Sequence, residues 1–138
     1  MPCRRMLFAI GAIMTAALNA ACQNESTPSN CICTTLFASV AVTVTDTLGA
    51  PVTGLNPSIT VARTGKAIVP VVAPPTGSGG YNVVTDEEIG QFNPAGDTLR
   101  FVATSGLRIA AAQFAVSAPG VCHCHVQKDA GPDTIVLR

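Results

Sequence analysis

Alternating hydrophobic and polar positions recur in short runs along the chain after residue 38 and predict β-strands. The clearest run is Ser39–Thr45 (SVAVTVT), in which Val40, Val42 and Val44 would share one face of a strand. Further runs predict strands at residues 58–63, 67–72, 81–85, 98–103, 107–116, 121–126 and 134–137. Short strands at close spacing are typical of two packed sheets. We therefore expect an all-β fold, a two-sheet antiparallel sandwich of about seven strands, transthyretin-like or Ig-like.

Two of these runs allow another interpretation. Pro70 lies inside the run 67–72, and because proline lacks a backbone N–H it indicates an edge strand or a break there. The alanines of residues 107–116 would also tolerate a helix. Between the runs, residues 74–80 (PPTGSGG) predict a loop and residues 86–88 (DEE) an acidic corner.

The first 21 residues differ in character from the rest of the chain. Arg4 and Arg5 precede an apolar stretch at residues 6–18, and small residues follow it. This order is typical of an export signal. The stretch is shorter than the roughly 20 apolar residues that a spanning helix needs. We expect residues 1–21 to be a signal peptide rather than a buried first helix.

The residues around Cys22 carry a further indication. Leu18, Asn19, Ala20 and Ala21 lead into Cys22, and this sequence resembles a bacterial lipoprotein signal. The resemblance implies lipidation of Cys22 and a protein anchored to a membrane of the bacterial cell envelope. Residues 22–30 are polar after the cysteine and are typical of a flexible tether. Ordinary cleavage after Ala20 or Ala21 would instead leave Cys22 free or disulfide-bonded.

The charge of the exported chain argues against nucleic acid as a partner. After residue 21 it has six basic and eight acidic residues, a formal charge of −2. The basic residues are scattered, whereas nucleic-acid binding normally needs clustered Lys and Arg. A basic patch for a membrane surface is absent from the sequence for the same reason.

Four cysteines form two Cys-x-Cys pairs, Cys31 with Cys33 and Cys122 with Cys124. In an extended segment the two thiols of a pair share one face, too far apart for an unstrained bridge between them. Exported chains meet an oxidising compartment. We expect two disulfides between the pairs, and the sequence leaves both such connectivities open.

A metal site is the alternative use of these residues. Cys31, Cys33, Cys122 and Cys124 could bind zinc or copper as thiolates, and His123 and His125 could contribute or form a surface site of their own. If residues 122–125 are extended, the two histidines face away from the thiols. Redox-active thiols are a third possibility. The disulfide interpretation is favoured, and with it no cofactor is expected.

Residues 42–54 (VTVTDTLGAPVTG) resemble the opening of carboxypeptidase-regulatory-like domains, which are transthyretin-like β-sandwiches. Gly80-Tyr81 at a strand start and the last apolar strand at 133–137 are also similar to that family. The resemblance covers residues 36–138 loosely and implies a non-catalytic accessory module. We place the sandwich domain at residues 31–138.

Catalytic motifs are not apparent in the sequence. No Gly-x-Ser-x-Gly elbow surrounds a serine, and a hydrolase triad would depend on His123 or His125. The protein is therefore expected to be a non-enzymatic envelope lipoprotein module, structural or binding an envelope protein or glycan. Loops at 73–80 and 86–97 are the expected exposed surfaces.

Overall fold

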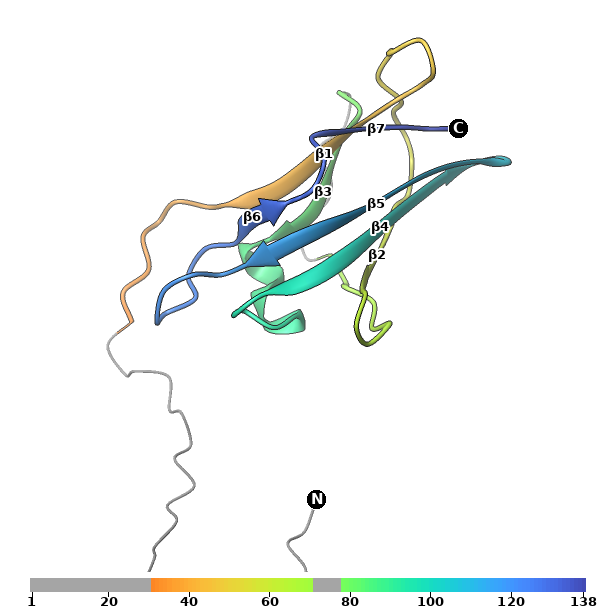
Figure 1. Cartoon of the computed structure of the whole chain (residues 1–138). Coiled ribbons are helices and arrows are strands. Elements are labelled where there is room, and N and C mark those ends of the chain that lie inside the picture. The colour runs from red at the N-terminus through yellow and green to blue at the C-terminus, as the bar shows by residue number, and fades with distance from the viewer. Residues whose placement is uncertain (1–30, 71–77) are drawn as a thin grey trace, which may run out of the picture.

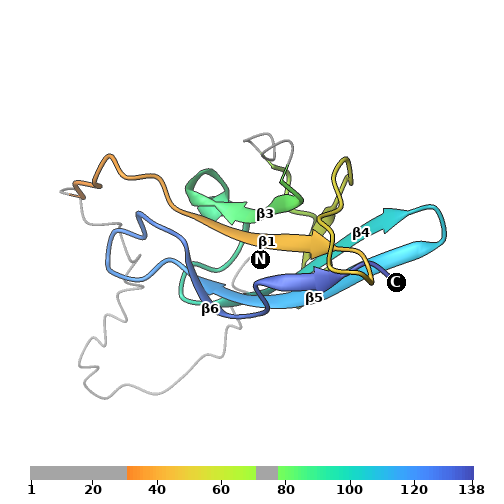
Figure 2. The same ribbon diagram turned by 90° about the horizontal axis from the view of Figure 1, so that it is seen from above.

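Two β-sheets pack face to face in the computed structural model, which describes residues 31–70 and 78–138 (Figure 1). Seen from above, β3 and β1 lie in one layer and β4, β5 and β6 in the other (Figure 2). The predicted signal peptide 1–21, Cys22 and the tether 22–30 lie outside the described residues, as does most of the 74–80 loop.

Seven strands in the described part of the chain make up the sandwich. The smaller sheet has the order β3–β1–β7, and the larger one has the order β2–β4–β5–β6. The strands are β1 (Ser39–Thr45), β2 (Ser58–Val61), β3 (Gly80–Thr85), β4 (Asp97–Ser105), β5 (Arg108–Ser117), β6 (Gln127–Ala130) and β7 (Thr134–Val136). The predicted all-β, two-sheet sandwich is confirmed.

The core lies between the sheets and follows the alternation of the sequence. Val40, Val42 and Val44 of β1 are all at most 3% exposed, because every second side chain of the strand faces the opposite sheet. Phe101 of β4 is fully buried, with the rings of Tyr81 and Phe114 at centroid distances of 6.4 and 6.5 Å. Such aromatic contacts across strands and sheets add specific packing to apolar burial.

The run 107–116 forms a strand, so the helical alternative is wrong. β5 pairs with β4 in nine consecutive residue pairs from Asp97↔Val116 to Ser105↔Arg108. Its alternation places Phe114 and Val116 in the core. Cross-strand pairing and burial outweigh the helix propensity of alanine, which is a weak preference.

Two predicted strands did not form as expected. Residues 67–70 contribute only an isolated bridge between Thr60 and Ala67 and a 2.9 Å hydrogen bond from Ile68 N–H to Ile59 C=O, consistent with a break at Pro70. Residues 121–126 form a turn and an irregular stretch rather than a strand, and the strand follows at β6 instead. His123 has a left-handed φ of 46°, which interrupts an extended segment.

One strand pair departs from the antiparallel arrangement. β7 pairs with β1 in parallel over three residue pairs, from Thr43↔Thr134 to Thr45↔Val136. β6 belongs to the larger sheet and β7 to the smaller, so the chain changes sheets between them. With most of the domain separating β1 from β7, no hairpin constrains them to run antiparallel.

The change of sheets brings Gly131 against the core. Gly131 has φ 130°, and an added Cβ would lie 2.6 Å from Cδ1 of Phe114. Gly96 has a similar φ of 141°, but an added Cβ there would meet nothing within 4 Å. Comparing alanine substitutions at the two glycines therefore separates the cost of backbone strain from the cost of overpacking the core.

We predict that Gly131→Ala lowers the free energy of unfolding by about 1–3 kcal/mol more than Gly96→Ala, because both variants carry backbone strain but only one overpacks the core. Urea unfolding with the disulfides intact measures the difference. Equal losses of unfolding free energy in the two variants would contradict close packing of Gly131 against Phe114 where the chain changes sheets.

Candidate functional site: the N-terminal junction

The segment that precedes β1 is not held by burial of its side chains. Residues 31–38 form no strand, and three of their apolar side chains are largely exposed: Ile32 (93%), Leu36 (76%) and Phe37 (55%). Apolar burial is the usual means of offsetting the entropy cost of ordering a chain. Other interactions must therefore hold this segment on the domain.

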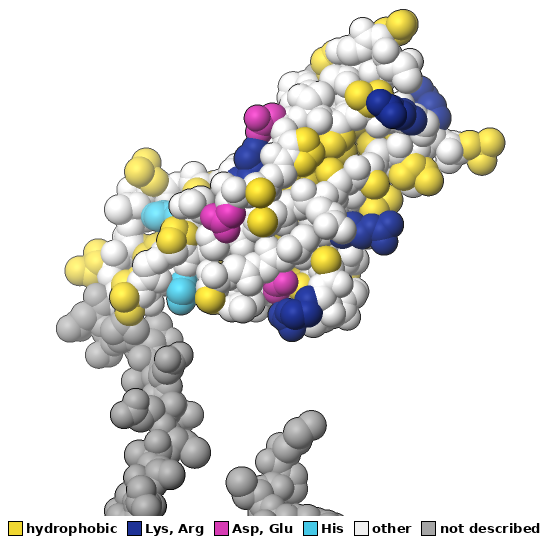
Figure 3. All heavy atoms as spheres, in the orientation of Figure 1, with side chains coloured by type: hydrophobic (Ala, Val, Ile, Leu, Met, Phe, Trp, Pro, Cys, Tyr) yellow, Lys and Arg dark blue, Asp and Glu magenta, His cyan; other side chains and the backbone are white. Residues whose placement is uncertain are grey.

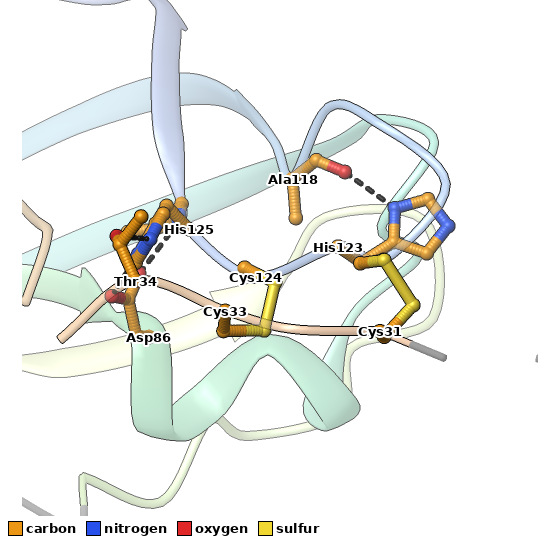
Figure 4. The surroundings of a disulfide bond; sticks show 10 residues. Cys31, Cys33, Thr34, Asp86, Ala118, His123, Cys124 and His125 are labelled. Carbon is orange, nitrogen blue, oxygen red and sulfur yellow. Dashed lines mark hydrogen bonds and ion pairs between the residues drawn. A yellow bond between two sulfur atoms is a disulfide. The ribbon is translucent and has the colours of Figure 1, made fainter. Parts of the chain in front are cut away.

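Two disulfides fasten the segment to the loop between β5 and β6 (Figure 4). Cys31 is bonded to Cys122 and Cys33 to Cys124, with Cα–Cα distances of 5.4 and 5.5 Å. Each bridge spans 91 residues, so the two segments run in the same direction past each other. Disulfide stapling is confirmed, and the structure selects one of the two connectivities that the sequence left open.

The Asp86 carboxylate also joins the N-terminal segment to the β5–β6 loop, a few residues after the disulfides in each segment. It accepts hydrogen bonds from the Ala38 N–H at 2.8 Å, the Val126 N–H at 2.7 Å and the His125 ring at 2.8 Å. The Asp86 N–H in turn donates to the Ala38 carbonyl at 3.2 Å. One side chain, only 13% exposed, thus links the N-terminal segment, the β5–β6 loop and the end of β3.

These residues together are called the N-terminal junction below. It consists of Cys31, Cys33, Thr34, Asp86, Cys122, Cys124 and His125.

A short helix positions Asp86. The 3₁₀ helix η1 (Asp86–Gln91) follows β3, and Thr85 is its N-cap in a capping box with Glu88. The Glu88 carboxylate accepts the Thr85 N–H at 2.7 Å, and the Glu87 N–H donates to the Thr85 hydroxyl at 3.3 Å. The predicted acidic corner is therefore a helix start, where acidic residues are favourable.

Hydrogen bonding outweighs burial in its effect on the pKa of the Asp86 carboxyl. Burial alone would raise the pKa of this carboxyl, but the donors from His125, Ala38 and Val126, together with the charge of His125 when protonated, lower the pKa below its usual value. An ionised Asp86 only accepts, so His125 Nδ1 carries the proton toward it. In neutral His125, Nε2 then accepts from the Thr34 hydroxyl at 2.7 Å.

The two histidines, His123 and His125, bind different partners. His123 donates from Nδ1 to the carbonyl of Ala118, whereas His125 is turned toward Asp86 and Thr34, and Figure 4 shows the two rings pointing to different neighbours. The left-handed turn at His123 removes the extended geometry on which the expected alternation of histidines and thiols depended.

The four cysteines of the proposed metal site are joined in disulfides and present no free thiolates in this structure. Within residues 31–70 and 78–138, no group of three or more His, Cys, Asp and Glu side chains is arranged to hold a metal ion. Of the residues that the sequence grouped for metal binding, the cysteines are joined in disulfides and the histidines make hydrogen bonds.

The sequence patterns do not predict the role of Asp86. Thr85-x-x-Glu88 is the sequence pattern of a capping box and would have indicated a helix start there. The contacts of Asp86 with Ala38, His125 and Val126 join residues about 40 or more positions apart, and no local pattern marks them.

Comparison of the chain with protein-family models, curated proteins and solved structures finds no match. In the part of the chain that the structure describes, no helix is long and apolar enough to cross a membrane.

The two disulfides should stabilise the domain non-additively. Each closes a loop of 91 residues, for which the loop-entropy model gives about 4–5 kcal/mol. While one bridge remains, the other closes only a small ring and contributes about 2 kcal/mol. We predict that replacing all four cysteines by alanine lowers the free energy of unfolding by about 6 kcal/mol. This loss exceeds the sum of the losses from two separate variants, one with Cys31 and Cys122 replaced by alanine and one with Cys33 and Cys124 replaced. Urea unfolding tests this, and single-pair losses that add up to the double loss would refute it.

Asp86 should make the stability of the domain dependent on pH. Its pKa is lowered by folding, so its contribution is present above the unfolded pKa of about 3.9 and is lost as the pH falls through the lower folded value. We predict that Asp86→Asn costs about 1–2 kcal/mol near pH 7 and reduces the loss of stability between about pH 5 and pH 2.

Glu87→Gln is the matched control, since it removes a neighbouring carboxylate that is exposed. Denaturant unfolding at a series of pH values measures both variants. An acid response of Asp86→Asn that equals that of the parent protein would contradict the role given to Asp86.

Proposed function

We propose that this protein is a non-catalytic module of the bacterial cell envelope, exported by residues 1–21 and held on a membrane by a lipid on Cys22. Residues 22–30 would link the anchor to the sandwich. The observation that carries the proposal is the covalent fastening of Cys31 and Cys33, the first cysteines after the tether, to the β5–β6 loop.

The disulfides support export. Structural disulfides persist in oxidising compartments outside the cytosol and are rare inside it. Two bridges at one end of a small domain therefore agree with the basic and apolar pattern of residues 1–21.

The position of the bridges supports a tethered domain. A pull on residue 31 acts on Cys31–Cys122 and Cys33–Cys124 before it reaches the hydrogen bonds of β1. Covalent bonds resist such a pull far better than the unburied segment 31–38 could by itself. A membrane anchor a few residues upstream is a source of that load, and the junction is built to bear it.

The Thr34–His125–Asp86 chain is part of this fastening in our proposal. Its hydrogen bonds have the order of a nucleophile, a base and an orienting acid, which is the one observation that favours hydrolysis. Asp86, however, also binds the backbone of Ala38 and Val126, as expected of a group that joins segments. We expect ester hydrolysis by the protein to be no faster than that of a Thr34→Ala variant.

The resemblance of residues 42–54 to carboxypeptidase-regulatory-like domains is consistent with an accessory module, and the two-sheet sandwich supports it. The partner in this proposal is an envelope protein or glycan. The alternative, a zinc or copper protein using Cys31, Cys33, Cys122, Cys124, His123 and His125, would require the bridges to be reduced.

Intact mass of the exported full chain tests the proposal, under native and denaturing conditions, with and without reductant and alkylation. We predict a lipid-modified N-terminal Cys22, no alkylated thiols before reduction, four after it, and no metal adduct. Cys22→Ala is the control and should lack the lipid mass. Free thiols with a zinc or copper adduct would establish the alternative, and an unmodified Cys22 would refute the anchor.

A further inference from the structure

The end of the sandwich that carries the N-terminal junction has an exposed apolar surface. Ile32, Leu36 and Phe37 project from the segment before β1, and Val121, 73% exposed, projects from the loop to which the segment is bonded. Figure 3 shows several hydrophobic side chains beside the histidines at this end, where the chain enters the domain. We call these four residues the apolar tip.

Formal charges are missing from both segments that form this end. Residues 31–38 (CICTTLFA) and 118–126 (APGVCHCHV) contain no Asp, Glu, Lys or Arg. Charged groups are costly to move toward a bilayer, whereas apolar side chains gain from leaving water. The acidic residues at this end, Asp86 and Glu87, belong to η1, and Asp86 binds the backbone of Ala38 and Val126. The apolar, uncharged side chains of the two segments themselves suit contact with a phospholipid bilayer.

The opposite end of the sandwich differs. Leu48 and Leu107 are also exposed there, at 92% and 102%, in the turns after β1 and between β4 and β5 (Figure 1). They stand next to charged groups, since Asp46 binds the Leu48 N–H and Arg108 follows Leu107. Exposed leucine alone therefore does not distinguish the apolar tip, but the absence of charged residues from its two segments does.

The chain upstream brings the apolar tip to the bilayer. Eight residues separate Cys22 from Cys31, so a lipid on Cys22 keeps Cys31, the residue before the tip, within about 30 Å of the membrane even with the tether fully extended. Tethering at such a distance gives a high effective concentration, and a weak apolar contact is then sufficient.

We infer that the apolar tip inserts into the interfacial region of the phospholipid bilayer that holds the Cys22 lipid, so that the sandwich stands with its junction on the membrane. This inference rests on the proposed lipid anchor. The disulfides and the hydrogen bond from Ala38 N–H to Asp86 hold the backbone on either side of the exposed side chains, since burial does not, and thus preorganise them for contact. The β4–β5 turn then points away from the membrane.

The chain has no tryptophan, so single tryptophans can report the contact. We propose Phe37→Trp at the tip and Leu107→Trp as the matched control, each in the full lipidated chain on vesicles of phosphatidylcholine brominated in its acyl chains. Bromine quenches only tryptophan that reaches the acyl region. We expect severalfold stronger quenching for Phe37→Trp, relative to unbrominated vesicles, and little for Leu107→Trp.

Vesicle flotation separates the two proposals. Protein that fails to float refutes the anchor and the inference together. Protein that floats without quenching of Phe37→Trp refutes the inference alone, as does equal quenching of both tryptophans. A blue-shifted but unquenched Phe37→Trp would assign the tip to a protein partner or a second copy instead. Absence of alkylatable thiols in both variants confirms that the junction has formed.

Discussion

The structure depends on how an unburied N-terminal segment is held against the sandwich. Residues 31–38 contribute almost nothing to the core, yet they lead directly into β1, the central strand of the smaller sheet. Two disulfides and the Asp86 carboxylate replace the missing apolar burial with covalent and charge-assisted bonds. These bonds therefore fix the backbone immediately before Ser39, where β1 begins and its side chains start to enter the core.

The same bonds connect parts of the chain that the sheets would otherwise leave separate. The β5–β6 loop belongs to the larger sheet, whereas Asp86 and the N-terminal segment adjoin strands of the smaller one. The junction therefore ties the two layers together at one end, and the crossing near Gly131 passes between them against Phe114. A sandwich held by its core alone could open at its ends, where fewer side chains pack.

Covalent fastening also explains why this end can remain apolar on its surface. Exposed Ile32, Leu36 and Phe37 would tend to collapse onto any available apolar surface if the segment were free. The bridges on either side of Ile32, and the hydrogen bond from Ala38 N–H to Asp86 after Phe37, restrain the backbone that carries these side chains. In the proposed anchored protein, the constraint that stabilises the fold also prepares the surface facing the membrane.

Local patterns in the sequence determined the sandwich, because alternation in β1, β2 and β4 reports which side chains face a core. They also determined that the two Cys-x-Cys pairs would bridge each other, since each pair is too widely spaced to close on itself. Only the tertiary structure decided the connectivity, the turn at His123 that replaced a predicted strand, and the contacts of Asp86. These depend on segments distant in the chain meeting at one end of the fold, and no residue spacing encodes such a meeting.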